Sequence, residues 1–175
     1  MQSIDHGNLG AEILEKDIRK YIETSEYDEI IIKAVKNHNK FKIEEGLNEK
    51  EEMFAQIVRD ADKIDIFRVN VEDPAIDVYG SPKEEIINSK VTEEVLESFK
   101  RIETVPRIYK KTAVDNVVCH IAYVFGIYYK ESVEIIINQG YFKKLIEFKS
   151  NIDITNKQFY EIREVVNLYI KSRLS

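Results

Sequence analysis

Three aspartates lie within one short segment that otherwise has the pattern of an amphipathic helix. They are Asp60, Asp62 and Asp65, in the stretch IVRDADKIDIFR. Apolar residues recur around them at helical spacing, at Met53, Ile57, Ala61 and Ile64. On a helical wheel Asp65 falls inside the apolar arc and the other two aspartates lie at its edges. A carboxylate that faces an apolar interior is costly unless it meets a cation, a metal ion or several hydrogen-bond donors.

A simpler interpretation of this segment needs no ligand. Arg68 follows Asp65 by three residues, so the two side chains can form an ion pair on the helix surface. Asp60 and Asp62 would then be carboxylates in contact with water. The segment alone does not decide between the two interpretations.

Two of the three histidines precede this segment on predicted helices. His6 lies in a helix predicted for about residues 3–24, and His38 ends a helix predicted for about residues 26–39. The apolar spacing places both imidazoles on the inner faces of their helices. Imidazole and carboxylate groups are common ligands of iron, manganese, zinc and nickel, and helical bundles often hold metals between helices. Either histidine alone is better explained as a hydrogen-bonded core residue, but together with the acidic segment they favour a metal site.

The start of the first predicted helix has two unusual features. Ser3 or Asp5 can act as its N-cap. Gly7 and Gly10 follow, although each glycine costs about 1 kcal/mol of helix stability relative to alanine. Their presence indicates close approach of another backbone or of a bound group.

Cys119 and His120 do not form a candidate catalytic pair. Adjacent residues of a helix do not face each other, and Cys119 lies among valines in a helical pattern. We predict that Cys119 is a buried core thiol.

The elements that must position these groups are predicted to be helices throughout. The chain has six Gly and three Pro, and its isoleucines recur with a period near 3.6 rather than 2. A break rich in Pro, Gly and Asp spans residues 71–82. We therefore predict a metal-binding helical region over residues 1–72 and a helical region over residues 73–175 packed on it. The third helix of the first region is predicted to begin near Asn48, with Glu51 completing a capping box.

Composition excludes several classes of function. The formal net charge is −6 and the pI is near 5.3, which argues against general binding of nucleic acid or anionic membranes. The single cysteine is compatible with a reducing compartment, and there is no apolar run long enough to span a membrane and no apolar signal segment. We expect a cytoplasmic protein.

Three blocks, in this order, resemble the latter half of an HD-domain phosphohydrolase: HGNLGAEIL at residues 6–14, IIKAVKNHNKF at residues 31–41 and IVRDADKIDIFR at residues 57–68. In that superfamily, metal ligands come from an upstream histidine, a His-Asp doublet, often two further histidines, and a final aspartate. His6 and His38 match the two further histidines, and Asp62 matches the final aspartate. The resemblance implies an all-α, HD-domain-like helical bundle with additional C-terminal helices, in which these three residues bind metal.

The resemblance also implies hydrolysis of a phosphate ester, with a small phosphorylated molecule such as a nucleotide as substrate. One or two ions of Fe, Mn, Ni, Co or Zn would activate water and neutralise phosphate charge. Asp62 and Lys63 would act in catalysis, and Arg59 and Lys63 would meet the phosphate. Alternatively, the Arg59 and Lys63 side chains lie in solvent at the edge of the helix and bind no phosphate. Asp60 and Asp65 would support the site through hydrogen bonds or an Arg68 pair rather than bind metal.

The chain departs from the superfamily pattern in one respect. No histidine precedes His6, and no adjacent His-Asp pair occurs anywhere. The ligand set is therefore incomplete, which implies a truncated or degenerate domain that could be inactive as it stands. A bundle cut in this way would expose apolar surface, so we also expect self-association into a homo-oligomer.

Three functions are compatible with these features. The first is a metal-dependent phosphohydrolase, which the resemblance favours. The second is a non-catalytic ligand-binding or regulatory module with an HD-like fold, which the missing doublet favours. The third is a purely structural helical protein whose aspartates are paired or solvated.

Overall fold

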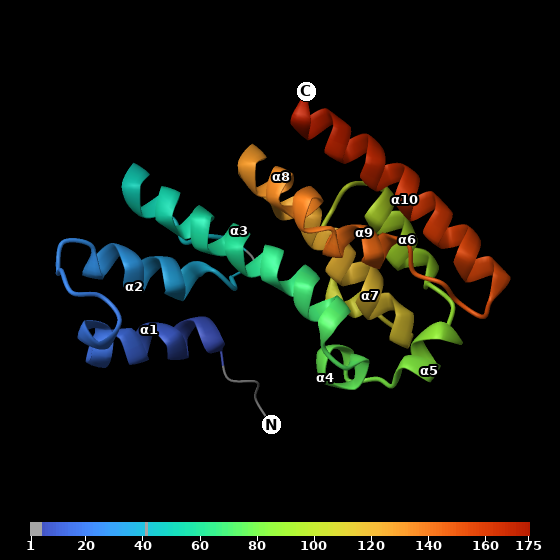
Figure 1. The fold of residues 1–175 in the computed structure, drawn as a ribbon, viewed down its shortest axis with the longest axis horizontal. Coiled ribbons are helices and arrows are strands. Elements are labelled where there is room, and N and C mark those ends of the chain that lie inside the picture. Colours follow the sequence, from blue (N-terminus) through green and yellow to red (C-terminus); the bar gives the residue numbers. More distant parts are fainter. Residues whose placement is uncertain (1–4, 41) are drawn as a thin grey trace. The chain divides into compact units, whose positions relative to one another are not determined.

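The computed structural model describes residues 5–40 and 42–175, and within them it contains ten α-helices and no strand (Figure 1). The predicted all-α class is therefore confirmed. The chain divides into two compact units, of which the first ends at Asp62 and the second covers Lys63–Ser175. The division falls inside helix α3 (Glu49–Glu72), whereas the predicted domain boundary follows the end of that helix.

The first unit contains α1 (His6–Asp17), which continues into a 3₁₀ turn at Ile18–Lys20, α2 (Asp28–Asn37), and the part of α3 up to Asp62. Helices α1 and α2 pack along each other. The carboxylate of Asp5 caps α1 by accepting hydrogen bonds from the amides of Gly7 and Asn8, each at 3.1 Å. The alternative cap, Ser3, lies outside the described residues.

The inner face of α1 differs from the predicted one. The buried residues are Gly7 and Ala11, with Ile18 in the following turn, whereas Leu9 and Ile13 are exposed. His6 is also exposed, so its predicted position on an inner face was wrong. The physical reason is backbone proximity, because α1 turns its smallest residues toward α2.

Gly7→Ala is expected to destabilise the first unit by about 1–2 kcal/mol, since the added methyl group has no space. A Cβ at Gly7 would lie 2.4 Å from Asn39 Oδ1 and 3.1 Å from the Lys36 carbonyl oxygen. Gly10→Ala is the matched control, because its Cβ would meet only one methyl group, Val35 Cγ1, at 3.0 Å. Hydrogen exchange of peptides from α1 and α2 measures both effects. Equal stability of the two variants would contradict the close approach at Gly7.

The start of α3 confirms the predicted capping box. The Glu51 amide donates to Asn48 Oδ1 at 3.0 Å, and the Asn48 amide donates to Glu51 Oε2 at 2.9 Å. Glu51 also forms an ion pair with Lys33 of α2. The capping box thus fixes the start of α3, and the ion pair joins it to α2.

The predicted apolar face of α3 is wrong in its first part, since Met53, Ile57 and Ala61 are exposed. The buried positions are instead Ala55, Asp60 and Phe67, beside the buried Glu51 of the capping box. A single apolar stripe does not describe this helix because its two parts belong to different units, and Phe67 packs in the core of the second.

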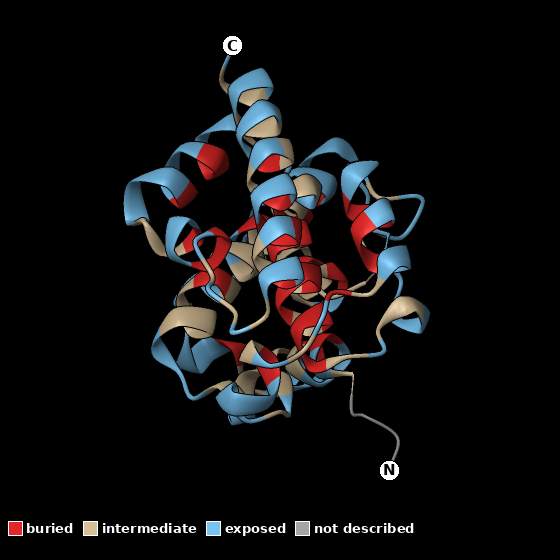
Figure 2. Cartoon of the chain, turned by 90° about the vertical axis from the view of Figure 1, so that its right-hand side faces the viewer, coloured by how far each residue is buried: buried red, intermediate tan, exposed pale blue. Residues whose placement is uncertain are grey.

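The second unit continues after α3 with a series of shorter helices and one long final helix. They are α4 (Ala75–Tyr79), α5 (Lys83–Ile87), α6 (Glu93–Lys100), α7 (Ala113–Ile121), α8 (Lys130–Gln139), α9 (Tyr141–Ile146) and α10 (Asp153–Leu174). Helix α7 is buried along most of its length and packs against α4, α5, α6 and α9. Figure 2 shows that α10, the helix leading to the C-terminus, has both buried and exposed positions.

The segment between α5 and α6 is held by side chains from distant parts of the second unit. Gln158 of α10 accepts a hydrogen bond from the Val91 amide at 3.2 Å and donates to the Val91 carbonyl at 2.9 Å. Thr155 Oγ1 donates to the Ser89 carbonyl at 3.0 Å. These side chains thereby satisfy the amide and carbonyl of Val91 and the carbonyl of Ser89.

Within residues 5–40 and 42–175, no helix has the length and apolarity needed to cross a membrane.

Candidate functional site

The N-terminal end of α1 is tied to the C-terminal end of α2 by Asp5. Its carboxylate accepts hydrogen bonds from Asn39 Nδ2 at 2.8 Å and from Lys40 Nζ at 2.5 Å. The hydrogen bonds from Lys40 and Asn39 hold the pKa of Asp5 well below its usual range, so this carboxylate is ionised at neutral pH. Because His6 follows Asp5 and His38 precedes Asn39, the same contacts bring the two histidines together.

His6, His38 and Asp62 lie close together in the first unit. The His6 and His38 rings meet edge to face with centroids 5.0 Å apart. His38 Nε2 lies 4.0 Å from Asp62 Oδ1, and the exposed fractions of these two side chains are 12% and 37%. The predicted inward position of His38 is therefore confirmed, and the site opens to solvent on the Asp62 side.

The orientation of His38 is set by its own helix. His38 Nδ1 lies 2.5 Å from the carbonyl oxygen of Val35, which can only accept a hydrogen bond. Nδ1 therefore carries a proton, and in the neutral ring Nε2 presents a lone pair. That lone pair and the Asp62 carboxylate are then two acceptors facing each other, an arrangement that a shared cation stabilises.

The arrangement fits a metal ion only in part. Adjacent ligands of a tetrahedral zinc ion lie roughly 3.4 Å apart, closer than His38 and Asp62. Within the described ranges, no group of three or more His, Cys, Asp or Glu side chains has the geometry to hold a metal ion. His38 and Asp62 thus offer two side chains that can ligate a metal ion, and His6 lies beside His38. They do not form a complete metal centre.

The two predicted phosphate-binding cations both contact backbone carbonyls. Arg59 Nη1 donates to the carbonyl of Lys40, just after α2. Burial lowers the pKa of Arg59, while the charges of Asp60 and Asp62 oppose that shift. Lys63 donates to the carbonyl of Gly126, within the second unit. Arg59 therefore lies in the electrostatic surroundings of Asp62, whereas the contact of Lys63 lies within the second unit.

The other two aspartates of the segment have different surroundings. Asp65 is exposed and pairs with Arg68, with Oδ1 to Nε at 2.8 Å. Its predicted place inside an apolar arc is therefore wrong, and the ion-pair alternative is confirmed. Asp60 is only 1% exposed, so it is not the solvated carboxylate of the simpler interpretation.

Cys119 is a buried free thiol, as predicted, and burial raises its pKa to about 12. Its neighbour His120 instead belongs to a cluster that the sequence analysis missed. The His120 ring contacts the rings of Tyr79 and Tyr123, with centroid distances of 5.2 and 5.4 Å. His120 Nδ1 donates to Asn70 Oδ1 at 2.8 Å. These partners lie up to 50 residues away, so no local spacing could indicate the cluster.

No protein-family model, curated protein or solved structure matches the chain.

Proposed function

We propose that the first unit is the metal-binding part of an HD-type phosphohydrolase, with an HD-like helical bundle and a small phosphate ester as substrate. The observation that supports this proposal most strongly is the meeting of His6, His38 and Asp62. They come from three separate stretches of the chain. The ring centroids of His6 and His38 are 5.0 Å apart, and His38 Nε2 is 4.0 Å from Asp62 Oδ1. A metal held there would be a divalent ion of Mn, Fe, Co, Ni or Zn.

Each of the chain's own residues has a defined part in this proposal. The Val35 carbonyl fixes the His38 ring so that Nε2 faces Asp62. Asp5 places His6 beside that ring through its contacts with Asn39 and Lys40. When bound, the metal would supply an acidified water molecule and a counter-charge for phosphate. Arg59, whose charge is near that of Asp62, would add to the binding of an anionic substrate.

Metal analysis of purified variants tests the site. We expect about one equivalent of Mn, Fe, Co, Ni or Zn per chain in the unmodified protein after loading and dialysis. His6→Ala and Asp62→Ala should each lower the content at least tenfold, by analogy with the loss of a metal ligand or its support. Asp65→Ala is the matched control, since it removes an exposed carboxylate of the same helix. Unchanged metal content in His6→Ala and Asp62→Ala would refute the proposed site.

A second candidate is a ligand-binding or regulatory module that keeps this fold without catalysis. It is favoured by the hydrogen bonds that Arg59 and Lys63 donate to backbone carbonyls, because these bonds use the two side chains within the protein rather than on a phosphate. Turnover of p-nitrophenyl phosphate with each metal separates the two candidates. Metal-dependent turnover that Asp62→Ala abolishes supports the hydrolase. Thermal stabilisation by phosphate or a nucleotide without turnover supports the binding module.

A further inference from the structure

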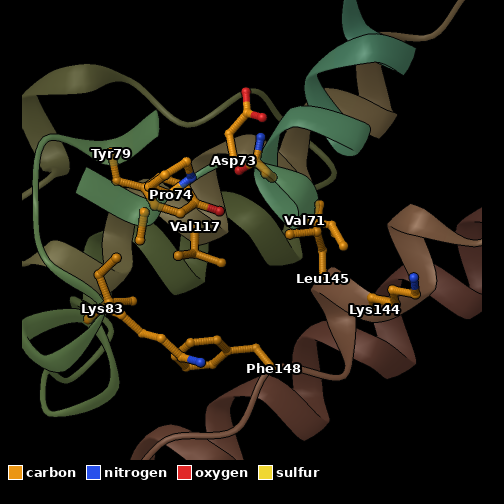
Figure 3. A pocket seen from close by; sticks show the side chains of 12 residues that line it. Val71, Asp73, Pro74, Tyr79, Lys83, Val117, Lys144, Leu145 and Phe148 are labelled. Carbon is orange, nitrogen blue, oxygen red and sulfur yellow. The ribbon is translucent and has the colours of Figure 1, made fainter. Parts of the chain in front are cut away.

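A pocket of about 400 Å³ lies in the second unit, and its lining includes none of His6, His38 and Asp62. It is formed by the end of α3, by α4 and α5, and by α7, α9 and the residue Phe148 (Figure 3). Most of its walls are apolar, with Val71, Ile86, Val117, Leu145 and Phe148 among them. Pockets that bind small molecules have this size and this character, with a few polar groups that orient the ligand.

One polar group at the pocket is a rigid hydroxyl. The ring of Tyr79 packs against that of His120, which also packs against the ring of Tyr123. Within the described part of the chain, the Tyr79 hydroxyl has no hydrogen-bond partner. Burial raises the pKa of Tyr79, so the hydroxyl keeps its proton and offers a donor to a ligand.

The charge at the pocket comes chiefly from Lys83. Its ammonium group has neither an ion-pair nor a hydrogen-bond partner among residues 5–40 and 42–175. In Figure 3 its side chain extends toward the part of the pocket where Phe148 lies, whereas the Asp73 carboxylate points away from Val117 and Phe148. The second lining cation, Lys144, already lies 5.4 Å from the centre of the Tyr141 ring. Lys83 is thus the group best placed to neutralise an anion.

We propose that this pocket binds a small organic molecule with an apolar, ring-sized body and one anionic group. The apolar walls would take the body, Lys83 would bind the anion, and the Tyr79 hydroxyl would donate a hydrogen bond. A neutral apolar ligand would leave the Lys83 charge without a role, and a cation would be repelled by it. This site is independent of the proposed metal chemistry.

The experiment compares 2-naphthoate with 2-naphthamide, which have nearly the same shape and differ in charge. Isothermal titration calorimetry of the full chain should show that 2-naphthoate binds with roughly tenfold higher affinity than 2-naphthamide, as expected for a charge-assisted contact. Lys83→Gln should remove that preference by weakening naphthoate alone. Ala75→Leu, which adds bulk to the pocket wall, should weaken both compounds.

Lys157→Gln is the matched control, because Lys157 is an exposed lysine of α10 that does not line the pocket. It should leave both affinities unchanged. Methyl chemical shifts of Val117 and Leu145 report binding at the pocket itself, and circular dichroism checks the fold of each variant. Equal affinities for the two compounds, no binding of either, or an unchanged preference in folded Lys83→Gln would each overturn the proposal.

Discussion

Asp115→Ala is expected to lower the free energy of unfolding of the second unit by about 4 kcal/mol, the largest stability effect predicted for this chain. Asp115 is fully buried, and its carboxylate accepts four hydrogen bonds. Two come from Thr92, through the amide at 2.8 Å and the hydroxyl at 2.6 Å. The other two come from the amides of Lys111 and Thr112, both at 2.9 Å. Removing the carboxylate leaves several of these donors without a partner and separates the start of α6 from the start of α7.

Urea unfolding followed by circular dichroism measures this change, because the chain has no tryptophan. Hydrogen exchange of peptides that contain Thr92 and Thr112 locates it. Asp153→Ala is the matched control, since Asp153 is also in the first turn of a helix but is exposed. That variant should lose less than about 1 kcal/mol. A similar loss in both variants would show that Asp115 acts only through the helix dipole.

The second unit is expected to lose stability as the pH falls from about 6.5 to about 4 because of His120. Burial lowers the pKa of His120 to about 4, whereas the unfolded chain has a value near the ordinary 6.5. Between these values the unfolded state binds more protons, so the free energy of unfolding rises with pH. The contribution is fully present above about pH 6.5 and is lost toward pH 4. Its size is about 3 kcal/mol, from the difference between the two pKa values.

His120→Gln isolates this contribution from that of the carboxylates. Glutamine has no charge to gain, so the difference in unfolding free energy between the two proteins should shrink by about 3 kcal/mol between pH 7 and pH 4. His120 is the only histidine of the second unit, so no other imidazole interferes. Its ring proton shifts in NMR should also show no titration above pH 5. A difference that does not vary with pH would contradict a neutral, half-buried imidazole.

Helical periodicity was sufficient to predict an all-α chain, since the isoleucines and valines repeat every three or four residues along most of it. It was not sufficient to predict which faces are buried. On α1 the larger residues Leu9 and Ile13 are exposed, because the small Gly7 and Ala11 permit the closer approach to α2. Hydrophobicity alone predicts that the larger residues are buried, whereas a short distance between the two helices requires small residues at their contact.

The candidate site was predictable only in its residue types, because the two imidazoles and the acidic segment fall on predicted helices. In the structure His38 Nε2 lies 4.0 Å from Asp62 Oδ1. The role of Asp5 was foreseen only as a cap, because its contacts with Asn39 and Lys40 span more than thirty residues. The pocket near Tyr79 had no such signal, since its walls come from positions between Asn70 and Phe148 that meet only after folding.

The hydrogen bonds between Gln158 and Val91 have a consequence for biosynthesis. The two residues are 67 positions apart, and a growing chain makes Val91 long before it makes Gln158. Until then, the backbone around Val91 must rely on water, and the apolar surface that α10 later covers stays open. We therefore infer that the second unit reaches its native state only after α10 has been synthesised and can pack.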